Sequence, residues 1–247
     1  MSETSEPMSN AIPPLRQALL MAAGRGKRLR PLTDERPKPM IEVGGRPILE
    51  WTIEALPASI EEVLIVVGYR QEMITEHFGD EWRGRRIKYV EQTELKGTGH
   101  VVHIAAPLLD ERFLVLNGDD LYLPADLERM TAWPLAILGL QVESNGRFGL
   151  LSVGGNGCLS AASDDQPQGS SGLINIGAYV LDRDFLNYEL VPIGDGSEFG
   201  LPQTMGVMAK DRDIHVVEAT AWLPIGFPDD VEKANEWLAQ YRTNQTK

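Results

Sequence analysis

The chain has 247 residues, 43% of them hydrophobic, so it is long enough to bury a full core as one large domain or two small ones. Its formal net charge of −13 argues against nucleic-acid binding, which needs a broad basic face, and its single cysteine, Cys158, excludes an internal disulfide and fits a reducing compartment. No apolar run approaches the roughly 20 residues that span a bilayer, and no secretory pattern opens the chain, so we expect a cytoplasmic protein that binds no membrane.

The beginning of the chain predicts a tail followed by a βαβ unit. Residues 1–14 are rich in Ser, Glu, Pro and Asn without apolar periodicity, which predicts a disordered tail before a single domain over 15–247. The apolar run Gln17–Met21 predicts a buried strand that leads into a Gly-containing loop. A helix that starts at Pro47 and a second buried strand at Glu62–Val67 complete the unit.

The same alternation continues to the middle of the chain. We expect strands at 87–90 and 113–116 with a helix at 98–106 between them. Alternating strands and helices favour an α/β fold in which helices flank a mainly parallel sheet.

The spacing of the predicted strands in the second half is more typical of antiparallel pairing. A turn signal at 154–157 separates two of its predicted strands, and Pro228 starts a final helix. We expect the first half to bind a nucleotide and the second half to shape the pocket of a partner substrate. The predicted strands of the second half lie at 135–142, 149–153, Leu159–Ser163, 174–181 and 214–219.

A basic, glycine-containing loop follows the first strand. Its small residues let backbone N–H groups approach phosphate oxygens, and its cations supply countercharge. It is not a Walker A loop, because no Gly-Lys-Ser/Thr follows, and it lacks the third glycine of the dinucleotide fingerprint. A plain tight turn is the alternative reading. The residues assigned to phosphate and nucleotide binding here are Ala22, Ala23, Gly24, Gly26, Lys27 and Arg28.

Two further features add charged groups. Pro37 and Pro39 stiffen the segment around Lys38, which can hold this cation in place for phosphoryl chemistry; otherwise the segment is a solvated basic loop. Asp119 follows an apolar strand, where open α/β sheets place ligands, and can hold Mg²⁺ against triphosphate oxygens. An Asp-rich turn is the alternative, which the preceding phosphate loop disfavours. His100 and His103 are three apart on a helix, but no third ligand accompanies them, so we assign them no metal.

The joint pattern resembles that of the sugar-phosphate nucleotidyltransferases, in particular glucose- or N-acetylglucosamine-1-phosphate uridylyl- and thymidylyltransferases. The resemblance implies a Rossmann-like, GT-A-like fold with a mixed, mainly parallel sheet. It also implies the Mg²⁺-dependent joining of a sugar 1-phosphate to an NTP, with UTP or dTTP favoured, to give an NDP-sugar and pyrophosphate. The segments that carry it are LMAAGRGKRLRPLT at 20–33, PKPM at 37–40, GRPIL at 45–49, VVGY at 66–69, EQ at 91–92, GTGH at 97–100, NGD at 117–119, NIGAY at 175–179 and IGFPDD at 225–230.

The resemblance also implies roles for particular residues. Arg28 and Lys38 would contact phosphates and, with Asp119 on magnesium, form the catalytic set. Nucleotide-binding roles fall on Gln92, Gly97 and Thr98, with Gln92 and Gly97 at the base, and sugar-binding roles fall on Gly149 and Asn175.

Two positions depart from the family's pattern. Pro224 stands where relatives usually carry a second metal carboxylate, and Gln166 stands in place of a lysine that contacts the sugar phosphate. Any magnesium would then rest on Asp119, triphosphate oxygens, water and Asp120 or another carboxylate. The sequence therefore leaves two readings, an active transferase and a catalytically weak nucleotide or nucleotide-sugar binding protein. It leaves open the sugar, the choice among UTP, dTTP and GTP, and the oligomeric state, a homo-oligomer included.

Overall fold

A computed structural model describes residues 12–145, 148–163 and 170–245 of the chain, so most of the predicted tail lies outside the described residues. The α-helices are α1 (Ile48–Ala55), α2 (Gln71–Phe78), α3 (Gly97–Ala105), α4 (Pro124–Met130), α5 (Leu201–Met208) and α6 (Pro228–Gln245). The strands are β1 (Gln17–Met21), β2 (Glu42–Val43), β3 (Arg46–Pro47), β4 (Glu62–Val67), β5 (Glu81–Trp82), β6 (Arg85–Glu91), β7 (Arg112–Asn117), β8 (Asp120–Tyr122), β9 (Ala136–Asn145), β10 (Leu150–Val153), β11 (Leu159–Ser163), β12 (Ser170–Asp182), β13 (Val191–Ile193), β14 (Glu198–Gly200), β15 (His215–Glu218) and β16 (Trp222–Pro224).

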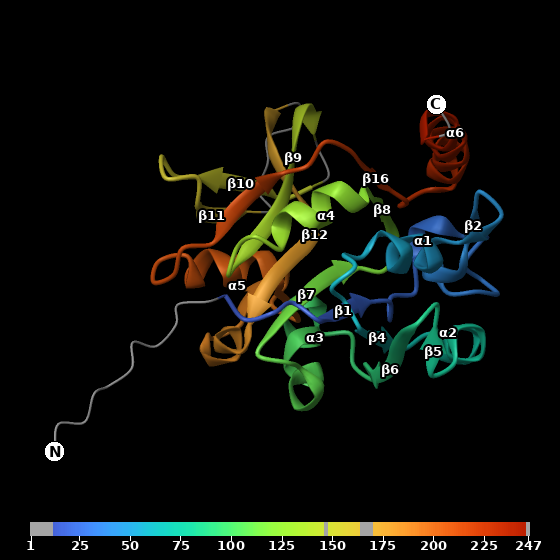
Figure 1. The fold of residues 1–247 in the computed structure, drawn as a ribbon, viewed down its shortest axis with the longest axis horizontal. Helices are drawn as coiled ribbons and strands as arrows, with labels where there is room; N and C mark the ends of the chain where they lie inside the picture. Colours follow the sequence, from blue (N-terminus) through green and yellow to red (C-terminus); the bar gives the residue numbers. More distant parts are fainter. Residues whose placement is uncertain (1–11, 146–147, 164–169, 246–247) are drawn as a thin grey trace, which may run out of the picture.

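A mixed sheet forms the centre of the molecule, with strand order β11-β10-β12-β7-β1-β4-β6-β5 (Figure 1). Its middle strands β7, β1, β4 and β6 run parallel to one another. β12 joins them antiparallel and pairs with β9 and β10 in the same sense, whereas β15 is parallel to β9. The predicted α/β class, a mainly parallel sheet with an antiparallel part in the second half, is confirmed.

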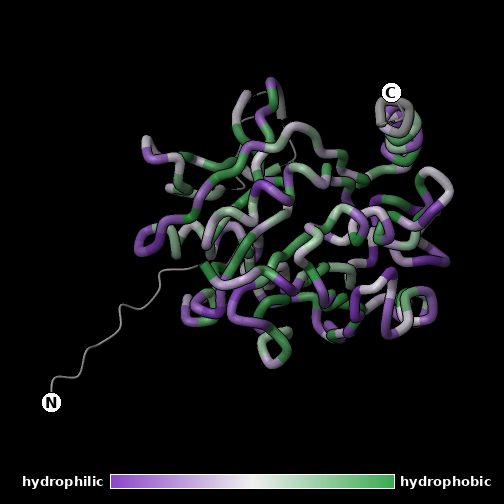
Figure 2. The backbone as a smooth tube through the Cα atoms, in the orientation of Figure 1, coloured by the Kyte–Doolittle hydropathy of each residue, from purple (hydrophilic) through white to green (hydrophobic). Residues whose placement is uncertain are grey.

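Helices cover both faces of this sheet. α1, α2 and α4 pack against one face through residues such as Ile53, Ile74 and Leu127, and α3 and α5 pack against the other. Every residue of β4 is buried, as expected of a parallel strand covered on both sides. The strands of the sheet centre are accordingly among the hydrophobic stretches of the chain, which are green in Figure 2.

Most predicted elements are present, and the differences have a physical reason. The strands at Gln17–Met21, Glu62–Val67 and Leu159–Ser163 have the predicted bounds, and the turn at 154–157 links β10 to β11. The helices α2, α4 and α5 were not predicted. Each has eight residues or fewer, and α2 buries only Ile74 and Phe78, so tertiary packing and not periodicity defines these helices.

The final helix returns the end of the described chain to the first half of the molecule. β16 pairs antiparallel with β8, and α6 then packs beside α1 in a separate small core that includes Leu29, Ile225 and Leu238. The segment between β16 and α6 is thereby placed beside the loop that follows β1. No helix in the described part of the chain is long and apolar enough to span a membrane.

Candidate active site

A cavity of about 520 Å³ opens where β1, β6 and β7 end, which is within the size range of small-molecule sites. The carboxyl ends of parallel strands are where open α/β sheets bind ligands. The structure brings most of the sequence-predicted residues together around this cavity, namely Ala23, Gly24, Arg28, Lys38, Gln92, Gly97, Thr98, Asp119, Gly149 and Asn175.

Three residues of the predicted loop do not line the cavity. Ala22 is buried beneath it, with its N–H donating to the carbonyl of Val66 at 3.0 Å. Lys27 is exposed to solvent. Gly26 adopts φ 59°, and a Cβ atom there would lie 2.9 Å from the Cβ of Lys38, so glycine is needed for the loop to pass this lysine.

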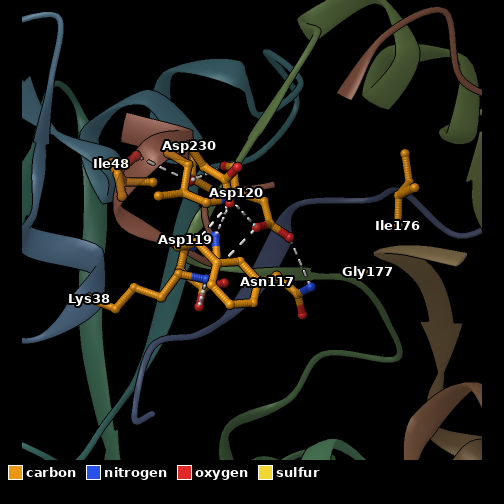
Figure 3. A network of polar contacts seen from close by, with 12 residues as sticks. Lys38, Ile48, Asn117, Asp119, Asp120, Ile176, Gly177 and Asp230 are labelled. Carbon is orange, nitrogen blue, oxygen red and sulfur yellow. Dashed lines mark hydrogen bonds and ion pairs between the residues drawn. The ribbon is translucent and has the colours of Figure 1, made fainter. Parts of the chain in front are cut away.

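Lys38 and two aspartates form a charged centre on the cavity wall (Figure 3). The ammonium of Lys38 lies 2.8 Å from Oδ2 of Asp119 and 4.0 Å from Oδ1 of Asp120. Burial alone would lower the pKa of Lys38, but the two carboxylates outweigh it and raise the pKa above its ordinary value. The lysine is therefore charged and held in place across the physiological range.

Asp120 is the buried member of this centre, with a side chain that is 7% exposed. Its Oδ2 accepts a hydrogen bond from Nδ2 of Asn117 at 3.1 Å, and its Oδ1 lies 3.4 Å from the backbone N of Ile225. Burial and the neighbouring Asp119 raise the pKa of Asp120 to about 6, while Lys38 opposes the rise. A buried carboxylate with a raised pKa in a cavity is a typical feature of functional sites.

One end of the cavity presents a free amide. Gln92 is 7% exposed, its backbone N–H donates to Val67, and its side chain makes no hydrogen bond to any described residue. Gly97, at φ 82°, packs so closely on β14 that an added Cβ would lie 2.5 Å from the carbonyl oxygen of Phe199. The Thr98 hydroxyl accepts the N–H of Leu201 at 3.0 Å, so it fixes the start of α5 against α3.

The opposite end is built by β10 and β12. Asn175 donates to the hydroxyl of Tyr179 at 2.9 Å and accepts the N–H of Gly177 at 3.2 Å, so its amide is fixed in orientation. Phe148 and Trp222 meet edge to face with ring centroids 4.9 Å apart beside it. The indole N–H of Trp222 is buried and has no hydrogen-bond partner among the described residues.

Several residues of the cavity wall were not assigned from the sequence. The ring of Phe227 lies under the guanidinium of Arg28, 5.4 Å from its central carbon. Asp230 accepts the N–H groups of Gly226 and Phe227 through one oxygen and binds Lys233 through the other. These residues lie more than 190 positions after the loop, and the pairing of β16 with β8 and the small core shared by Leu29 and Ile225 bring them to it.

Two further sets of residues were singled out in the sequence: the histidines His100 and His103, and the positions Pro224 and Gln166, which differ from the family's pattern. Within the described residues, no group of three or more His, Cys, Asp or Glu side chains is arranged to hold a metal ion. Pro224 lies at the cavity directly opposite Asp120 on the neighbouring strand. Gln166 lies outside the described residues.

Comparison with known proteins yields one family and a consistent fold. Residues 17–241 match the model of the nucleotidyl transferase family. The bifunctional protein GlmU of Methanocaldococcus jannaschii is 31% identical over 223 residues, or 90% of this chain, but the match covers only 54% of that relative. The chain thus spans about half the length of such relatives. The UTP–glucose-1-phosphate uridylyltransferase AglF of Haloferax volcanii is 30% identical over 94% of this chain and 100% of its own length.

Solved structures agree with the fold. A UDP-glucose pyrophosphorylase complexed with UDP-glucose superposes with a TM-score of 0.78 at 22% identity, over 92% of this chain and 99% of that one. A Bacillus anthracis structure in complex with a sucrose, named after glucose-1-phosphate thymidylyltransferase, gives a TM-score of 0.79 at 20% identity, over 90% of this chain and 94% of that one.

Proposed function

Because the chain belongs to the nucleotidyl transferase family, among the sugar-phosphate nucleotidyltransferases, we propose that it joins a sugar 1-phosphate to an NTP and releases pyrophosphate. We favour UTP or dTTP as the nucleotide. One observation carries the proposal: a charged centre of Lys38, Asp119 and Asp120 lies on a single cavity wall between a free amide at Gln92 and a fixed amide at Asn175. Such a cavity has room for a base at one end, phosphates in the middle and a sugar at the other.

The proposed reaction needs a divalent cation, and the donors in the cavity fit one. Asp119 offers carboxylate oxygens, which Mg²⁺ prefers, and Mg²⁺ commonly uses one or two carboxylates together with phosphate oxygens. Asp119 and Asp120 would hold the ion. Bound there, Mg²⁺ would offset negative charge on the phosphates of the nucleotide.

The residues of the chain supply the remaining requirements. An oxygen of the sugar phosphate must attack the α-phosphorus in line with the departing pyrophosphate, so two anions have to be brought together. Arg28 and Lys38 carry positive charge into the cavity, where they can bind these phosphates and offset charge on the leaving group. No protein nucleophile is required.

The base end supports a pyrimidine. The amide of Gln92 has both a donor and an acceptor free, as the imide edge of uracil or thymine requires, and its burial makes an unmatched partner costly. We expect Gln92→Ala to change the ranking of NTPs more than the maximal rate, because base contacts are remote from the reacting phosphorus. An unchanged ranking would remove Gln92 from the base pocket.

Pyrophosphate release tests the proposed function. It is measured over a matrix of UTP, dTTP, GTP, CTP and ATP against several sugar 1-phosphates, beginning with UTP and glucose 1-phosphate, the pair in the name of the AglF relative. Asp229→Asn, an exposed carboxylate outside the cavity, is the matched control for Asp119→Asn. We expect turnover in the wild type and the control and almost none in Asp119→Asn.

The resemblance implies a metal carboxylate at the position of Pro224, and a proline there favours one other candidate, a weakly catalytic nucleotide or nucleotide-sugar binding protein. Nucleotide binding by the wild type without pyrophosphate release on any pair would favour this candidate.

A further inference from the structure

The hairpin of β13 and β14 forms part of the cavity wall at the predicted base end, where β14 contributes Glu198 to the lining. The backbone N–H of Phe199 donates to the carbonyl of Lys96 at 2.9 Å. A Cβ atom added to Gly97 would lie 3.1 Å from the Cβ of Glu198, so the two residues are in close contact. The backbone of Glu198 is therefore held beside the loop that follows Gln92.

Glu198 differs from two neighbouring acidic residues in having no partner. Glu94 pairs with Lys96, and Asp195 accepts hydrogen bonds from the N–H and the hydroxyl of Ser197. The side chain of Glu198 is exposed and forms no ion pair and no hydrogen bond with any described residue. Its carboxylate thus keeps its acceptor capacity at the wall of the cavity.

The charge of this carboxylate limits what it can bind. A phosphate beside Glu198 would be repelled, because like charges disfavour each other. Hydroxyl groups are neutral donors, and in dinucleotide-binding folds an acidic side chain accepts the 2′-hydroxyl of a ribose. In a nucleoside triphosphate the ribose is attached directly to the base, so a base at Gln92 and Gly97 brings the ribose to this end of the cavity.

We propose that Glu198 accepts a hydrogen bond from the ribose 2′-hydroxyl of the nucleotide, so that the chain selects UTP over 2′-deoxynucleotides such as dTTP. The inference rests on the proposed function, because it takes the base of the nucleotide to lie at Gln92. It narrows the choice between UTP and dTTP through the chemistry of the ribose and not through that of the base.

UTP and dUTP differ only in the 2′-hydroxyl, so their comparison tests the inference directly. Values of kcat/KM for both are measured from pyrophosphate release with a saturating sugar 1-phosphate. The matched control is Glu94→Gln, which changes an exposed carboxylate outside the cavity lining. We expect the wild type and the control to favour UTP by about tenfold or more, the effect of one hydrogen bond to a charged group. Glu198→Ala should lower this ratio about tenfold, and Glu198→Gln, which keeps an acceptor oxygen, should retain part of it.

Isothermal titration of the same variants with UTP and dUTP separates this inference from the proposed function. A preference for UTP in binding that depends on Glu198, without pyrophosphate release, leaves the inference standing and refutes the proposed function. Pyrophosphate release with the same UTP-to-dUTP ratio in the wild type and Glu198→Ala, or with no preference for UTP in the wild type, overturns the inference alone. Loss of discrimination between glucose 1-phosphate and its 2-deoxy analogue in Glu198→Ala, with the UTP-to-dUTP ratio unchanged, also overturns it, because Glu198 would then bind the acceptor sugar.

Discussion

Two buried carboxylates lie at opposite ends of the parallel strands, and their surroundings are opposite as well. Glu62 opens β4 at the amino end, where it accepts the amide of Gln17 at 2.8 Å and pairs with Lys88 at 2.9 Å and Arg86 at 3.3 Å. Burial would raise its pKa, but these partners lower the pKa below its ordinary value. Asp120, at the carboxyl end, has a pKa raised to about 6.

The difference shows that burial of a carboxylate does not by itself mark a functional site. Glu62 forms ion pairs with two cations, Arg86 and Lys88, so its ionised form is favoured. These contacts hold β4 and β6 together. Asp120 lies beside the carboxylate of Asp119, and the single ammonium of Lys38 does not outweigh the effects of burial and of Asp119 on its pKa. The charges around the two buried carboxylates, and not their burial, distinguish the amino end of the parallel strands from the carboxyl end, where the candidate site lies.

The largest effect is expected from Lys38→Ala. Removing the ammonium takes away the charge that would bind phosphates, so pyrophosphate release should fall by about 100-fold or more. Arg86→Ala, which removes a cation from the amino end, is the matched control and should leave turnover near that of the wild type. Turnover in Lys38→Ala equal to that in Arg86→Ala would remove the distinction between the two ends.

Glu62→Gln should cost stability and not activity. At pH 7 we expect a loss of about 1.5–3 kcal/mol in the free energy of unfolding, the range for a hydrogen bond to a charged group. Because the folded pKa of Glu62 is lowered, its contribution is present above the unfolded pKa of about 4.3 and is lost as the pH falls through the folded pKa. Urea unfolding at pH 7 and pH 3 measures this. A difference from the wild type that does not shrink toward pH 3 would contradict the assignment.

Asp120→Asn should have the opposite pH dependence when no metal or ligand is present. The pKa of Asp120 is raised from 3.8 to about 6, so the folded wild type loses stability as the pH rises through this window, and above it the ionised group is unfavourable. The variant lacks this penalty. Thermal melts in EDTA should therefore show its melting temperature gaining on that of the wild type between pH 4 and pH 7. A constant offset would show that the charge of Asp120 is already compensated.

The smallest effect is expected from Phe227→Leu. The ring lies under the guanidinium of Arg28, and a cation–π contact at an exposed site is worth about 0.5–1 kcal/mol, or a few-fold in binding. We expect KM for the NTP to rise a few-fold with kcat nearly unchanged, and Phe227→Tyr to bind as the wild type does. A KM in Phe227→Leu that matches Phe227→Tyr would show that Arg28 is placed by other contacts.

The sequence predicted which end of the sheet carries the candidate site better than it predicted all the residues that line the cavity. Apolar runs such as Glu62–Val67 predicted the central strands because full burial on both sides leaves a continuous hydrophobic pattern. Lys38 and Asp119 were predicted because each stands in a local pattern of prolines or of a strand end. The place of Phe227 was not predictable, because the pairing of β16 with β8 that brings it to Arg28 depends on contacts far apart in sequence. The raised pKa of Asp120 likewise depends on burial and on distances to Asp119 and Lys38 that no local pattern encodes.

Pyrophosphate release by Asp119→Asn and Glu62→Gln, measured side by side with the wild type on its best pair of substrates, tests the central claim most directly. Both variants neutralise a carboxylate of the same sheet, one at each end of the parallel strands. We predict that Glu62→Gln, assayed where it is folded, retains turnover close to that of the wild type, whereas Asp119→Asn loses about 100-fold or more. Full turnover in Asp119→Asn, or an equal loss in both variants, would contradict the account.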